Sequence, residues 1–63
     1  MTRNQFVVSV GSENAAIEIE TRILSAGEEF LPPIAKRVLR GKAPSRGYWD
    51  WLYSQAKVML NAR

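Results

Sequence analysis

The stretch Lys36–Leu60, KRVLRGKAPSRGYWDWLYSQAKVML, holds both tryptophans and both tyrosines of the chain, and residues 36–46 hold five of its nine Lys and Arg residues. Its second part predicts a helix over Arg46–Asn61, because large apolar residues recur there at helical spacing opposite a polar stripe. We expect this helix to supply most of the core and the rest of the chain to pack against it.

Two large residues of this helix lie outside its main apolar face. Trp51 and Val58 are seven residues apart, so they are expected on the same side of the helix, next to the polar stripe. An exposed tryptophan beside an exposed valine is typical of a surface that binds another protein. The alternative is that another segment of the chain covers both residues.

The segment Phe6–Val10 is rich in β-branched residues and is followed by Gly11. Alternation would put Phe6, Val8 and Val10 on one face, which predicts a short strand.

Residues 13–26 fit two structures. Ser12 is a good helix N-cap and Gly27 a good helix stop, which favours a helix. The residues Ile17–Ile23 alternate almost perfectly between apolar and polar, which favours a strand that pairs with Phe6–Val10 as a hairpin. We expect the helix, with the hairpin as the alternative.

The helical alternative leaves the strand Phe6–Val10 without a partner in its own chain. An unpaired apolar strand exposes backbone hydrogen-bonding groups and tends to pair with another copy. We therefore expect a homodimer joined by a two-stranded ribbon, with Phe6 and Val8 at the interface.

Pro32 and Pro33 predict the start of a further helix, Pro33–Arg40, because proline is tolerated in a first turn. Gly41 is expected to end it, and Ser45 is expected to cap the last helix.

The fold class expected for residues 1–63 is therefore a single small α+β domain, mostly helical, with a short N-terminal strand followed by about three helices. The alternative is an N-terminal β-hairpin plus two helices. The order of strand and helices is similar to that of ribbon-helix-helix repressors in the N-terminal half, but residues 28–44 interrupt it, and no family is assigned.

Composition excludes several classes of function. The chain has neither Cys nor His, so disulfides are impossible and a zinc site is not expected. Ser45 and Ser54 have no base to activate them, so we expect no catalytic residues, no cofactor and no enzyme activity. No apolar run approaches the roughly 20 residues of a membrane span. These features predict a small cytoplasmic protein that does not act at a membrane.

Charge is divided unevenly along the chain. Residues 1–30 hold two cations and five anions, whereas residues 31–63 hold seven cations and one anion. The densest cationic cluster is expected to contact the phosphates of DNA or RNA, since such clusters release counterions on binding; it consists of Lys36, Arg37, Arg40, Lys42 and Arg46. The alternative is that these cations complement a helix dipole and face solvent.

The expected function is that of a nucleic-acid-binding regulator that uses this basic cluster. The alternative is a protein-binding adaptor or inhibitor that engages its partner through Trp51 and Val58.

Overall fold

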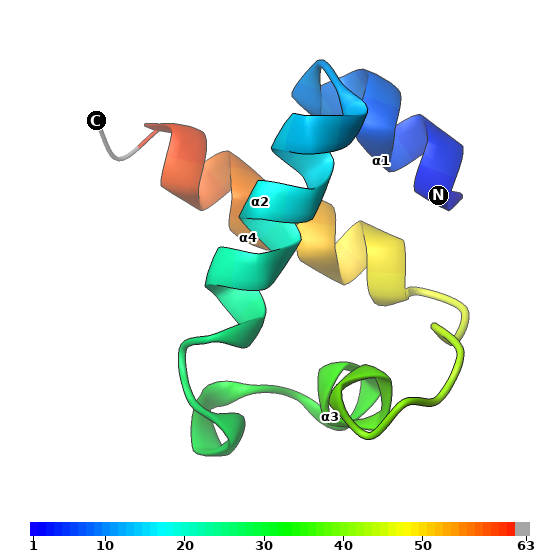
Figure 1. Ribbon diagram of the computed structural model, residues 1–63, viewed down its shortest axis with the longest axis vertical. Helices are drawn as coiled ribbons and strands as arrows, with labels where there is room; N and C mark the ends of the chain where they lie inside the picture. Colours follow the sequence, from blue (N-terminus) through cyan, green and yellow to red (C-terminus); the bar gives the residue numbers. More distant parts are fainter. Residues whose placement is uncertain (62–63) are drawn as a thin grey trace.

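The chain folds into α-helices joined by short turns, as the computed structural model, which describes residues 1–61, shows (Figure 1). The helices are α1 (Arg3–Val10), α2 (Glu13–Leu24), α3 (Pro33–Leu39) and α4 (Tyr48–Asn61), and a single 3-10 turn, η1 (Glu28–Phe30), lies between α2 and α3. No strand occurs within residues 1–61. The expected α+β fold is therefore wrong, and so are its N-terminal strand and its hairpin alternative.

The N-terminal segment is a helix because Thr2 and Gln5 form a capping box. The Thr2 hydroxyl accepts a hydrogen bond from the Gln5 backbone N–H at 3.2 Å, and the Gln5 side-chain oxygen accepts one from the Thr2 N–H at 2.7 Å. Gly11, at φ +111°, then turns the chain. These caps, together with burial of Phe6, outweigh the β preference of the valines. Without a strand, the ribbon joining two copies and the likeness to ribbon-helix-helix repressors lose their basis.

Residues 13–24 form the helix that was favoured over the strand. The Ser12 hydroxyl accepts from the Ala15 N–H at 3.1 Å, as expected of an N-cap. Ala16, Ile19 and Ile23 face inward on one stripe. The alternation of apolar and polar residues over Ile17–Ile23 wrongly indicated a strand, because the helix buries only some of the apolar residues in this stretch.

The core lies where α2 crosses α4 and where α1 packs against both (Figure 1). Tyr48, Leu52 and Ala56 recur every four residues along α4, and each is fully buried. The Tyr48 hydroxyl donates a hydrogen bond of 2.8 Å to Glu20 of α2. The pKa of Tyr48 is raised, mainly because the phenol is buried and to a smaller extent because of this hydrogen bond. The aromatic helix expected to organise the fold is therefore confirmed from Tyr48 to Asn61.

The helix α3 lies apart from this crossing and is seen nearly end-on in Figure 1. It begins at Pro33, as expected, and joins the core through Ala35, with Leu31 buried just before it. Val38 is half-buried against the core, whereas Arg37 and Leu39 are exposed. None of the helices within residues 1–61 is long and apolar enough to cross a membrane.

Candidate nucleic-acid interface

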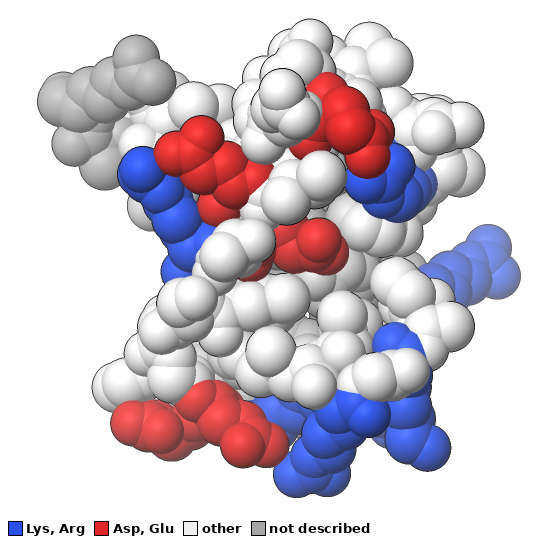
Figure 2. All heavy atoms as spheres, viewed as in Figure 1, with Lys and Arg blue, Asp and Glu red and all other residues white. Residues whose placement is uncertain are grey.

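The cations expected to contact phosphate gather around α3 and the loop that follows it. We call them the basic surface, and in Figure 2 their region shows as blue atoms at the lower right, over α3 and the 41–47 loop. Four of them are exposed and Lys36 is half-buried. The basic surface consists of Lys36, Arg37, Arg40, Lys42 and Arg46.

The turn that ends α3 holds the backbone of Lys42 close to the last turn of the helix. The Lys42 N–H donates to the Arg37 carbonyl at 3.0 Å, and the Gly41 N–H donates to the Val38 carbonyl at 3.0 Å. With Gly41 at φ +88°, these two bonds form a Schellman motif, which needs a left-handed residue just beyond the helix. The motif ties the backbone of Lys42 to the last turn of α3, where Arg37 lies.

Ion pairs neutralise the cations of α1 and α2 but leave most of the basic surface unneutralised. Arg3 pairs with Glu13, and Arg22 pairs with Glu18 at 2.8 Å. Within the basic surface only Arg40 has a carboxylate partner among residues 1–61, namely Glu28 at 3.1 Å. Both of those side chains are more than half exposed, so the pair offsets little of the charge.

Asp50, the acidic residue of α4, pairs with the N-terminus of the chain. A carboxylate oxygen of Asp50 lies 3.1 Å from the Met1 amino nitrogen, not near a cation of the basic surface. Four cations of the basic surface have no carboxylate partner in the described chain, namely Lys36, Arg37, Lys42 and Arg46; Lys57 of α4 has none either, but it lies outside this cluster. A cluster of this kind attracts polyanions, and its local potential is positive.

Ser45 does not cap α4, contrary to expectation. The helix begins at Tyr48, and the first intrahelical acceptor is the carbonyl of Gly47, which takes the Trp51 N–H at 3.0 Å. The Ser45 hydroxyl oxygen is buried and has no hydrogen-bond partner within residues 1–61. The loop from Lys42 to Gly47 therefore carries its charge without a side-chain cap from Ser45 at the start of α4.

The residues expected at a protein interface are scattered. Val8 is 79% exposed on α1 and Val58 is 65% exposed on α4. Phe6 is buried, with its ring 5.6 Å from that of Trp49, so its apolar surface is already used inside the molecule. Trp51 is half-buried against the core, with its ring 6.0 Å from that of Tyr48. Of these four residues, the structure leaves Val8 and Val58 most open to a partner.

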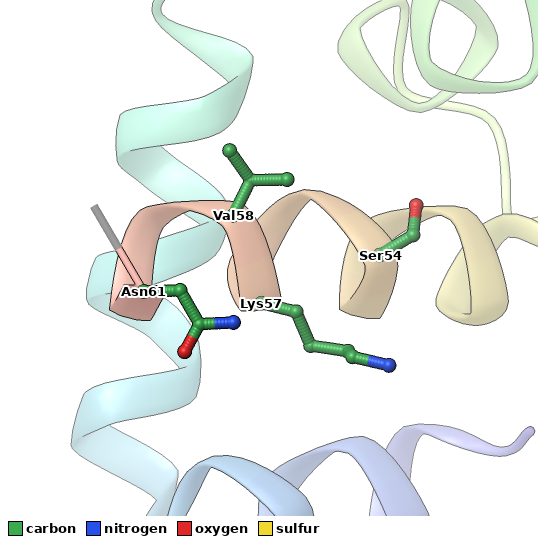
Figure 3. A pocket seen from close by; sticks show the side chains of 4 residues that line it. All are labelled: Ser54, Lys57, Val58 and Asn61. Atoms are coloured by element: carbon green, nitrogen blue, oxygen red, sulfur yellow. The ribbon is translucent and has the colours of Figure 1, made fainter.

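Val58 belongs to a shallow hollow on the outer side of α4, together with Ser54, Lys57 and Asn61 (Figure 3). In Figure 3, Val58 points toward the upper edge of the helix and Lys57 and Asn61 toward its lower edge. Because all four residues come from one helix, this hollow has no opposing wall and cannot enclose a small ligand. Within residues 1–61 no three acidic side chains lie together as metal ligands would.

Sequence reasoning missed Phe30, which is 74% exposed in η1. It lies directly before Leu31 and two prolines, a stretch from which only the start of the following helix was predicted. The available signal was that a large aromatic residue stands in an otherwise polar turn, where packing does not require it.

Comparison with protein-family models, with curated proteins and with solved structures found no match to this chain. Its function is therefore argued from its own residues.

Proposed function

We propose that this protein is a non-enzymatic regulator that binds DNA or RNA through the basic surface. The supporting observation is the contrast in pairing: Arg3 and Arg22 are held by carboxylates of α1–α2, whereas four cations around α3 have no such partner within residues 1–61. A cation that no carboxylate holds can contact a phosphate without first breaking an ion pair. The nucleic acid then releases the counterions that had been condensed on that phosphate.

Four such cations set the expected strength of the salt effect. Each phosphate neutralised on duplex DNA contributes about 0.9 to the slope of log affinity against log salt. Four contacts predict a slope between about −3 and −4, so raising salt from about 50 mM to about 200 mM weakens binding by about 100-fold.

The test is fluorescence anisotropy with a labelled DNA duplex and a labelled single-stranded RNA of random sequence. The double variant Arg37→Gln with Lys42→Gln should reduce the salt slope by about 1.8, because it removes two phosphate contacts. The control, Arg3→Gln with Lys57→Gln, removes the same charge from α1 and α4 and should leave the slope nearly unchanged. Absence of binding at low salt to both probes, or equal loss in both variants, would contradict the proposal.

A second candidate is a protein-binding adaptor, favoured by the exposed side chains of Val58 and Phe30. It predicts that a substitution at Val58 removes a protein partner and leaves nucleic-acid binding intact. We also keep the homodimer as a proposal, because two copies would offer two basic surfaces to one nucleic acid. The cytoplasm is the proposed location.

A further inference from the structure

Two hollows, one mainly apolar and one of mixed polarity, lie side by side on the face that α2 forms with the C-terminal half of α4. One has a volume of about 420 Å³ and is lined by Ile23, Phe30, Leu31 and Val58 among others. The next has about 430 Å³ and is lined by Val10, Ile19 and Leu60 among others. Arg22 and Met59 line both hollows and so form the ridge between them. We call the two together the α2–α4 groove.

Three large apolar side chains that line the groove are exposed to solvent. Phe30 is 74% exposed, Val58 65% and Leu60 42%. Across residues 1–61 there are seven exposed large apolar side chains, against six large apolar or aromatic side chains that are buried. Because a short chain has a marginal core, covering such a groove would add stability that the monomer lacks.

The charge of the groove suits a second copy of the same chain. Its charged lining residues are Glu18 and Arg22, which pair at 2.8 Å and sum to zero. A surface that meets its own copy brings like charges together unless they cancel locally, as these do. A strongly charged partner would find no complementary charge here, whereas the basic surface carries four cations without a carboxylate partner in the described chain.

We propose that two copies associate through the α2–α4 groove. With a two-fold axis through the ridge of Arg22 and Met59, the hollow that contains Phe30 in one copy faces the hollow that contains Leu60 in the other. Each Phe30 ring then enters the partner's hollow between Val10, Ile19 and Leu60. The contact is made twice by symmetry, so one exposed aromatic residue covers both hollows.

This arrangement leaves the basic surface open. In Figure 1, η1 and the C-terminal half of α4 lie on the left of the view and α3 lies to the right of them. The dimer contact is independent of nucleic acid, so its test and the anisotropy test above can fail separately.

Sedimentation equilibrium without nucleic acid tests the dimer. The wild type should shift toward twice the 7.1 kDa mass of one chain as concentration rises. Phe30→Asp should raise the dimer dissociation constant by about tenfold or more, since it places a charge in an apolar contact. The matched control, Val8→Asp, alters an equally exposed residue on α1 and should change that constant by less than about twofold.

Circular dichroism shows whether each variant remains folded, and Val58→Asp provides a second substitution in the groove. A wild type that stays at 7.1 kDa at every concentration would overturn the dimer. Dissociation by Val8→Asp but not by Phe30→Asp or Val58→Asp would overturn the surface.

Cross-linking tests the two-fold geometry, and the chain has no cysteine of its own to interfere. A mixture of the single variants Phe30→Cys and Leu60→Cys should form a mixed disulfide under mild oxidation. The same mixture made with Val8→Cys in place of Phe30→Cys should form about tenfold less. Equal yields from both mixtures would overturn the proposed contact and leave the groove to a different protein.

Discussion

The α2–α4 crossing and the α3 region use their side chains in opposite ways. At the crossing, Tyr48 and Leu52 are fully buried, and a hydrogen bond joins Tyr48 to Glu20. Around α3, only Ala35 and the neighbouring Leu31 are buried, and the remaining surface carries cations. The first region therefore holds the molecule together, whereas the second can change its charge with little effect on stability. That separation is what a binding surface on so small a protein requires.

The largest expected effect is at the centre of the crossing. Leu52→Ala empties a fully buried site and should lower the free energy of unfolding by about 2–5 kcal/mol. Leu39→Ala, the same change at a 46% exposed position of α3, should cost less than about 1 kcal/mol. Urea denaturation measures both. Equal losses would mean that α3 is as much a part of the core as α4 is.

Removing the hydroxyl of Tyr48 should be the next largest change. Tyr48→Phe leaves Glu20 half-buried without this donor and should cost about 1–3 kcal/mol near neutral pH. Because folding raises the pKa of Tyr48, its contribution to stability is complete below pH 10, the ordinary value, and is lost as pH rises beyond it. The wild type should therefore keep its full advantage over Tyr48→Phe in urea denaturation up to about pH 9 and lose it progressively as the pH rises from about 10 toward about 12. A constant advantage over that range would show that the tyrosine does not ionise on unfolding as described.

A backbone effect should follow at the boundary between the two regions. Gly47 has φ +88° at the start of α4, and nothing lies within 4 Å of the position where a Cβ would stand. Gly47→Ala should therefore cost about 1–2 kcal/mol from conformation alone. Gly47→Asn should cost less, since asparagine adopts left-handed conformations more readily. Thermal melts of the two variants provide the check, and equal destabilisation would point to a steric cause.

The smallest expected effect concerns binding alone. Glu28→Gln removes the carboxylate that pairs with Arg40 and should strengthen binding to duplex DNA by about 2–5-fold at low salt. Its free energy of unfolding should change by less than about 0.5 kcal/mol, because both side chains are exposed. Glu13→Gln, which breaks the pair with Arg3 on α1, is the matched control and should leave binding unchanged. Equal strengthening by both variants would mean that total charge, not the basic surface, decides binding.

The sequence predicted the helical part of the fold where caps and periodicity agree. Ser12 marked the start of α2, Pro33 the start of α3, and the spacing of Tyr48, Leu52 and Ala56 the inner face of α4. It failed at Phe6–Val10, where the run of valines was weighed above the capping box of Thr2 and Gln5. A local hydrogen-bond pattern of this kind specifies a helix end more directly than β-branched composition does.

The candidate site was predictable only in part. The basic cluster was evident from its density, but how few of its cations form ion pairs depended on where Glu28 and Asp50 lie in space. The groove was not evident, since Phe30 and Leu60 are 30 residues apart and lie on a common surface only because α2 crosses α4.

The central claim, that the basic surface binds nucleic acid, is tested most directly by NMR. A duplex DNA of random sequence is added at low salt to the ¹⁵N-labelled protein, and backbone amide shifts are followed. Amides of residues 36–47 are expected to move progressively and to return when salt is raised, while those on the outer face of α1 around Val8 stay in place. Shifts confined to α1, or no shifts at low salt, would contradict the account.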